Sequence, residues 1–296
     1  MLYLQGIKVN NFLYSLLMIT FYSYRYLLAR TIQTNLDTVS KTNNEFFTDF
    51  FSQIEDMGKV VYKISRKKYF FYFIDKIDSN IYLLQFAKEQ EIQIPHEGKN
   101  SVDLMTDIIT PYVNMIVDLK RQIILIENKL VVYSDNETPR ARISKLLEQF
   151  LHPYDIIINV KEISSSKQFW ENINQADQIY NITLDLPPPN LFNGRFEADK
   201  LVKEVYGSTH FSDFKIILKS ATGGLKILKD AFGSYINLIA SGGGSYTVKL
   251  LLDGIRDKIG NFKYVRKLIY DVKDLKEIDK DKLKRDLDNL DDYKDE

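Results

Sequence analysis

Two hydrophobic periods recur along this chain, one typical of helices and one typical of strands. Between residues 43 and 57, phenylalanine and isoleucine fall on one helical face, after two asparagines that favour a helix N-cap. Residues 59–65 and 69–74 are expected to form the strands of a β-hairpin, with a run of three basic residues, 66–68, near its turn. The first part of the chain therefore mixes helices with antiparallel strands.

A second hairpin and a second helix are expected further along. The hairpin has strands at 122–127 and 130–133. The helix begins near Pro139, because proline is favoured in a first helical turn, and apolar residues follow it at helical spacing. We therefore end a β-rich first lobe, residues 1–152, at His152.

The second half of the chain alternates strands and helices more regularly. Strands are expected at 155–160, 179–186 and 214–219, and helices at 167–173, 196–206 and 226–240. The glycine-rich residues 241–245 are typical of a flexible loop, and two more strands follow before residue 272. We assign residues 153–272 to a second, basic lobe and residues 273–296 to a charged helical tail. The whole pattern predicts an α+β protein of two lobes, with mixed or antiparallel sheets, helices packed on them and a charged C-terminal helix.

The N-terminal residues contain an uncharged run, 9–24, that is too short for a membrane span. A span needs roughly 20 apolar residues, and this run also contains several polar side chains. From Met18 onward the side chains alternate, which predicts a β-strand. We expect no membrane span. A further hypothesis takes Met18 as the natural start, which would make residues 1–17 a dispensable extension.

The amino-acid composition limits which ligands and metal sites are expected. The 296 residues carry 40 basic and 40 acidic side chains, so any binding of a polyanion must come from an uneven distribution of charge. The absence of cysteine excludes disulfides and thiolate metal sites and agrees with a cytoplasmic location. The three histidines are far apart in the sequence, so we expect no metal centre and no cofactor.

Positive charge is concentrated between residues 215 and 267. This window contains ten basic residues and three acidic ones, a net charge of +7. Such a surface suits the phosphates of nucleic acid, although an ordinary solvated surface is the competing interpretation. The candidate phosphate contacts are Lys215, Lys219, Lys226, Lys229, Arg256, Lys258, Lys263, Arg266 and Lys267.

Two other functions stay open at this stage. Asp118, Glu127 and Lys129 have the spacing of a metal-dependent nuclease, in which two carboxylates hold Mg²⁺ and the lysine assists the attacking water. The same residue types also suit the turn of a hairpin. Exposed tyrosines or the C-terminal helix are the expected anchors of a protein–protein interaction module. No catalytic constellation stands out, so we expect a binding protein rather than an enzyme.

Three segments in succession resemble a known family. Residues 45–82 are expected to form a helix followed by a hairpin, and residues 122–151 a hairpin followed by a helix. The segment FSDFKIILK, 211–219, is a basic strand with a glycine-containing segment after it. This order, over about residues 19–251, resembles the RexA-type phage-exclusion proteins of lambdoid phages.

The resemblance carries several expectations. It implies a cytosolic α+β protein that forms a homodimer and binds double-stranded DNA with little sequence preference. It also implies a role in abortive infection or another antiphage system, together with a membrane-protein partner.

Overall fold

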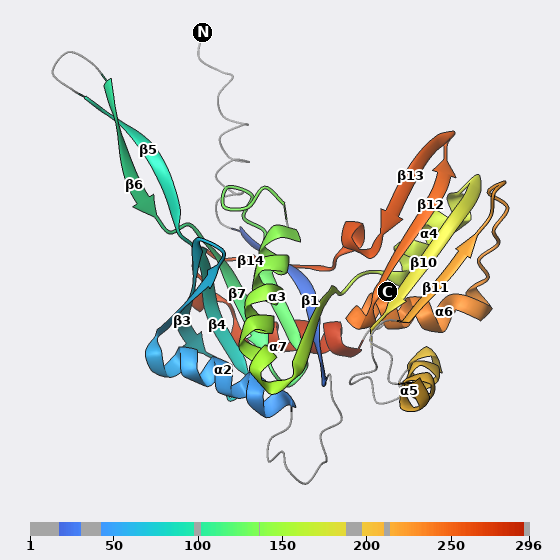
Figure 1. The fold of residues 1–296 in the computed structure, drawn as a ribbon, viewed down its shortest axis with the longest axis horizontal. Coiled ribbons are helices and arrows are strands. Elements are labelled where there is room, and N and C mark those ends of the chain that lie inside the picture. Colours follow the sequence, from blue (N-terminus) through green and yellow to red (C-terminus); the bar gives the residue numbers. More distant parts are fainter. Residues whose placement is uncertain are drawn as a thin grey trace.

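The computed structural model describes residues 18–30, 43–97, 102–135, 137–187, 197–209 and 214–292. The chain forms two lobes, each with its own sheet and helices, and a two-stranded arm that projects from the first lobe (Figure 1). The named strands pair antiparallel throughout the described residues. The predicted α+β class with two lobes is therefore confirmed. The expected extension 1–17 lies outside the described residues.

The first lobe is built on a large sheet of order β14-β1-β8-β7-β4-β3-β2, with β9 also paired to β1. The long strand β1 is flanked on one edge by two strands in succession, because its first residues pair with β14 and its last residues with β9. The strands of this sheet are β1 (Met18–Arg30), β2 (Lys59–Ile64), β3 (Lys67–Lys76), β4 (Ile81–Lys88), β7 (Tyr112–Asp118), β8 (Ile123–Glu127), β9 (Ile156–Glu162) and β14 (Lys267–Asp271).

Helices cover both faces of this sheet. On one face α2 (Asn43–Met57) and α3 (Glu137–Leu151) bury the apolar stripes that the sequence predicts. On the other face α7 (Lys280–Asp292) packs through Leu283, Leu287 and Leu290, with the short turn η5 (Leu275–Glu277) beside it. Strand β8 shows both contacts, since Ile124 faces the first layer and Ile123 the second. The charged C-terminal helix is thus the third layer of the first lobe.

The second lobe has a four-stranded sheet of order β11-β10-β12-β13. Helices pack on one face of it, where a separate apolar core lies. The elements of this lobe are α4 (Ser166–Gln175), β10 (Gln178–Leu186), α5 (Glu197–Thr209), β11 (Phe214–Lys219), α6 (Lys229–Leu238), β12 (Ser245–Leu252), β13 (Ile255–Gly260) and the turn η4 (Asn261–Tyr264).

The second lobe is inserted between two strands of the first. The chain leaves β9 at Ile163 and returns to β14 after Arg266, and these two ends are hydrogen-bonded, with Arg266 N donating to the Ile163 carbonyl at 2.8 Å. Ser164 and Val265 form a bridge next to this bond. The predicted boundaries at residues 152 and 272 therefore do not follow the sheets, because β9 and β14 both pair with β1.

The prediction of a flexible loop at residues 241–245 is wrong, and these residues lie at the junction between the lobes. Residues Ile239–Gly243 form a buried π-helical turn, η3, between the lobes. Arg25 of β1 donates from Nε to the carbonyl of Ser241 at 2.7 Å. Gly242 has a φ of 92°, and a Cβ there would lie 2.5 Å from the Cβ of Arg25. The glycines allow close packing of the two lobes, and they do not provide a flexible connection.

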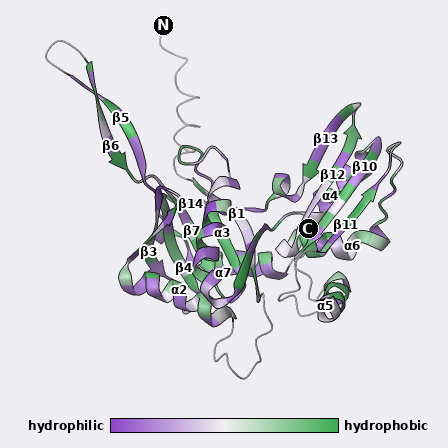
Figure 2. Ribbon diagram, viewed as in Figure 1, coloured by the Kyte–Doolittle hydropathy of each residue, from purple (hydrophilic) through white to green (hydrophobic). Residues whose placement is uncertain are grey.

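Two further differences concern strands. The hairpin expected at 122–133 does not form, because β8 pairs with β7 and β1, while residues 130–133 turn away. Between β4 and β7 the chain forms an arm that we did not predict, made of β5 (Gln90–Glu97) and β6 (Val102–Ile109). The arm keeps hydrophobic positions along its strands (Figure 2). No helix among the described residues has both the length and the apolar character needed to cross a bilayer.

Candidate nucleic-acid interface

Among the described residues, helices pack on only one face of the second lobe's sheet, and strand alternation decides which side chains reach the other, open face. In β11 the residues Phe214, Ile216 and Leu218 pack against the apolar core. Lys215, Ile217 and Lys219 alternate with them and are exposed. The predicted strand at 214–219 therefore presents two of the nine candidate cations on the open face.

A row of basic side chains crosses the open face. Lys219 of β11 is opposite Asn181 of β10, which is opposite Lys249 of β12, and Lys249 is opposite Lys258 of β13. Residues directly opposite in an antiparallel pair point to the same side of the sheet. Three of the four positions in this row are therefore lysines on one face.

An arginine and an aromatic ring lie next to this row. Arg256 is opposite Leu251, two residues along from the Lys249–Lys258 pair, so it shares the open face. Its guanidinium carbon lies 5.4 Å from the centre of the Tyr180 ring. Tyr180 is the extra residue where the register of β10 shifts between Ile179 and Asn181. A bulge of this kind re-aims a side chain, and here it places the ring against the arginine.

The middle of the face is small and polar. Thr183 of β10 lies between Ile217 and Thr247 in the register, and Asp185 lies between Lys215 and Ser245. Asp185 is the one acid that the register places on this face among the described residues of the four strands. Its Oδ2 lies 3.8 Å from Nζ of Lys161, a residue of β9. The face therefore combines five cations with a single acid that has a cation of its own nearby.

The structure divides the nine sequence-predicted candidates into three groups. Lys215, Lys219, Arg256 and Lys258 share the open face. Lys229 instead begins α6, the helix that packs on the opposite face, and Lys226 lies three residues before it. Arg266 lies in the connection between the lobes, with Lys263 just before it in η4 and Lys267 just after it at the start of β14.

The predicted list lacks one residue of the open face, Lys249. Two cues in the sequence identify it: it lies within the basic window, and residues 245–250 alternate polar and apolar side chains. The register then places it in the centre of the basic row.

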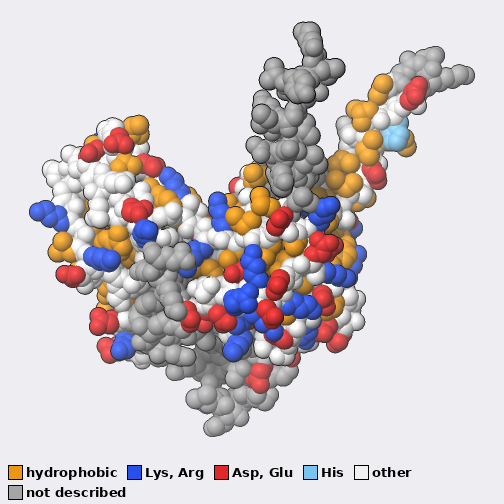
Figure 3. All heavy atoms as spheres, turned by 180° about the vertical axis from the view of Figure 1, so that it is seen from behind, with side chains coloured by type: hydrophobic (Ala, Val, Ile, Leu, Met, Phe, Trp, Pro, Cys, Tyr) orange, Lys and Arg blue, Asp and Glu red, His pale blue; other side chains and the backbone are white. Residues whose placement is uncertain are grey.

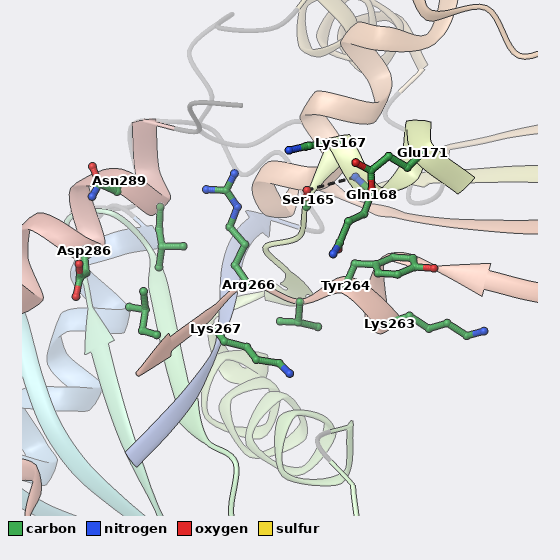
Figure 4. Close-up of a pocket in the computed structure, with 13 residues that line it drawn as sticks. Ser165, Lys167, Gln168, Glu171, Lys263, Tyr264, Arg266, Lys267, Asp286 and Asn289 are labelled. Atoms are coloured by element: carbon green, nitrogen blue, oxygen red, sulfur yellow. Dashed lines mark hydrogen bonds between the residues drawn. The ribbon is translucent and has the colours of Figure 1, made fainter. Parts of the chain in front are cut away.

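The three cations at and beside the connection have other contacts. Lys263 forms an ion pair with Asp257 at 3.0 Å, and the hydrogen bond from Lys263 holds the pKa of Asp257 below its usual range. The Nζ of Lys267 lies 5.2 Å from the centre of the Tyr22 ring. Arg266 points from the connection toward α4, whereas Lys263 and Lys267 point away from it (Figure 4). These cations do not extend the row on the open sheet.

A cavity of about 740 Å³ lies between α4, the connection and α7. Its lining carries both signs of charge, and the acids Glu171 and Asp286 are among its residues. Asp286 already accepts a hydrogen bond from the Tyr270 hydroxyl at 2.9 Å. A lining of mixed sign is a weaker site for a polyanion than the open face.

The alternative nuclease site is not assembled. Asp118 and Glu127 lie at opposite ends of the β7–β8 pair, because Asp118 is opposite Ile123 and Glu127 accepts a hydrogen bond from the backbone of Asn114. The four residue steps along β8 from Ile123, opposite Asp118, to Glu127 correspond to roughly 13 Å, which is too far for the two carboxylates to share one Mg²⁺. Asp118 is also fully buried and paired with Arg121.

The third member of that alternative has another contact. The Nζ of Lys129 lies 4.2 Å from the centre of the Tyr112 ring. Over the described residues, no group of three or more metal-binding side chains comes together.

Comparison with known proteins adds no assignment. The chain matches no protein-family model, and the search of curated proteins found no match.

Proposed function

We propose that this protein binds double-stranded DNA without reading its base sequence, through the open face of the β11-β10-β12-β13 sheet. The observation that carries the proposal is the row of Lys219, Lys249 and Lys258 across three of the four strands. Lysines contact phosphate as point charges and release condensed counterions, which favours binding to any sequence.

The width of the sheet supports contact with the backbone and not with base edges. Three inter-strand spacings of about 4.8 Å place the outer strands roughly 14 Å apart, before side chains are added. A major groove is about 12 Å wide and admits a helix or a two-stranded ribbon. A four-stranded sheet is too wide to enter it, so its cations reach phosphates along the groove edges.

The salt dependence of affinity tests this mechanism. Each neutralised phosphate contributes about −0.9 to the log–log slope, so five cations predict a slope of roughly −4 to −5. We expect the triple variant Lys219→Gln, Lys249→Gln, Lys258→Gln to reduce the steepness of that slope by about 3. Fluorescence anisotropy of a labelled duplex in EDTA, over a series of salt concentrations, measures both values.

A matched control removes the same charge from the helix-covered side. Lys200, Lys226 and Lys229 are exposed there, and their change to Gln should leave the slope within experimental error. Equal effects of the two triple variants would refute the open face as the site. If the wild-type protein fails to bind duplex at low salt, the DNA proposal falls and a protein ligand becomes the better hypothesis.

The same experiment separates duplex from single strands. Base stacking on an aromatic ring is worth about 1–3 kcal/mol per base in proteins that bind single strands. Tyr180 is the ring that the described strands place on this face, and a duplex keeps its bases stacked inside, so Tyr180→Ala should leave duplex affinity nearly unchanged. A large loss with this variant, together with tighter binding of a single strand than of a duplex, would redirect the proposal to single-stranded nucleic acid.

The biological role follows from the sequence resemblance alone. We propose that DNA binding serves phage exclusion in the cytoplasm. In cells that carry the gene, phage plating should be reduced, and the triple variant on the open face should restore it. Unchanged plating with the wild-type gene would reject the antiphage role and leave the DNA-binding test intact.

A further inference from the structure

A second cavity lies in the first lobe, at the root of the β5–β6 arm. Its volume is about 530 Å³, within the usual range for small-molecule sites. The turn of the β2–β3 hairpin, the end of β4 and the first turns of α3 line it. These elements bring four cations to one place: Arg66, Lys67, Lys88 and Arg142.

The charges around this cavity do not cancel. Glu89 and Glu91 also line it, but Glu89 forms an ion pair with Lys68 at 3.0 Å. That leaves one acid, Glu91, for the four cations. None of the four has an acidic partner within ion-pair distance in the described part of the chain. A group of unneutralised cations lowers the free energy of a bound anion.

Lys88 shows the electrostatic cost of gathering these cations. Burial lowers its pKa, and the nearby charge of Lys67 lowers it further. Lys88 donates a hydrogen bond to the carbonyl of Val132 at 2.7 Å, and its Nζ lies 4.5 Å from the centre of the Tyr133 ring. These contacts fix its position without neutralising its charge.

Tyr133 supplies a second, independent observation. Its side chain is 5% exposed and lines the cavity, and its hydroxyl has no hydrogen-bond partner among the described residues. Its ring is parallel to that of Phe86, which is parallel in turn to Tyr69. A buried hydroxyl without a partner is costly, and a small movement of the lining that opens it to the cavity would let an acceptor atom of a ligand satisfy it.

We propose that this cavity binds a phosphate-bearing small molecule of about the size of a nucleotide. Its phosphate group would accept hydrogen bonds from Lys67, Lys88, Arg142 and the Tyr133 hydroxyl. A terminal phosphate offers three acceptor oxygens and close to two negative charges at neutral pH, and a guanidinium can bind two of those oxygens at once. The cavity lies in the first lobe, so this proposal is independent of DNA binding by the second.

Isothermal titration calorimetry with ATP tests the proposal, with inorganic phosphate and adenosine as the other two probes. We expect ATP and phosphate to bind and adenosine not to bind. The variant Arg142→Gln should weaken ATP binding roughly tenfold or more, since a hydrogen bond to a charged group is lost. Tyr133→Phe keeps the stacked ring and removes only the hydroxyl, and it should also weaken binding.

Lys145 provides the control. It is exposed on the same helix, one turn from Arg142 and outside the cavity, so Lys145→Gln should bind ATP like the wild type. Absence of ATP binding would overturn the proposal, and so would equal affinities of Arg142→Gln and Lys145→Gln. Displacement of ATP by duplex DNA would also overturn it, because the anion would then be a backbone phosphate.

Discussion

At the scale of single residues, Glu162 joins three parts of the molecule. It lies at the end of β9, where it is buried 3.3 Å from the guanidinium of Arg140 in α3 and accepts a hydrogen bond from Asn261 of the second lobe at 2.9 Å. Removing one partner of a buried pair leaves the other charge uncompensated. We expect Glu162→Ala to lower the free energy of unfolding by about 3 kcal/mol, measured by urea denaturation at pH 7.

The pH dependence of Glu162 has a definite sign. Burial raises its pKa above the ordinary 4.5, and Arg140 only partly opposes that effect. Above pH 4.5 the unfolded chain therefore holds fewer protons at this site than the native protein, so the contribution to stability falls as pH rises. Glu162→Gln keeps an acceptor for Asn261 but cannot ionise. We therefore expect the part of the fall in unfolding free energy between pH 4.5 and 7 that is due to Glu162 to be absent from this variant. Parallel stability curves for the two proteins would contradict it.

At the scale of elements, α7 packs on one face of the large sheet. Leu283, Leu287 and Leu290 are buried there, although every other residue of the helix is polar. Deleting a buried leucine side chain costs about 2–5 kcal/mol, so Leu287→Ala should lower stability by that amount. Arg285→Ala, an exposed change in the same helix, should stay within about 0.5 kcal/mol. Equal effects would mean that the helix does not pack on the sheet in solution.

Helix α7 also shows which features of the fold can be predicted from sequence patterns and which cannot. The leucine spacing predicts an amphipathic helix, and the alternation in residues 214–219 predicts which lysines are exposed. Neither pattern shows which other element the helix or the strand packs against. The pairing of β1 with β9 and β14 joins residues more than a hundred positions apart, and this long-range pairing fixes the lobe boundaries and the buried glycine turn. The row of Lys219, Lys249 and Lys258 likewise depends on register between strands that are separated in sequence.

At the scale of the whole molecule, the β5–β6 arm is the feature that most needs a partner. Val102, Leu104, Met105 and Ile108 are more than half exposed, and an isolated two-stranded hairpin is only marginally stable in water. Hydrophobic side chains follow the projecting arm in the space-filling view (Figure 3). The described strands of the arm carry four acids and no lysine or arginine, so the arm does not suit DNA.

We therefore expect the arm to contact a second copy of the chain, as the predicted homodimer requires, because its acids complement the basic surfaces of the body. Replacing residues 90–109 by Asn-Gly should preserve the fold, since β4 and β7 already pair beside the root of the arm. Light scattering should then give the mass of a dimer for the full chain and of a monomer for the variant. The open face of the second-lobe sheet is intact in the full chain and in the variant. The monomeric variant should therefore keep the salt slope per chain. It should lose only the added affinity that comes from linking two binding sites in a dimer. A monomeric full-length protein would contradict the dimer, and a flattened salt slope in the variant would mean that the arm itself contacts DNA.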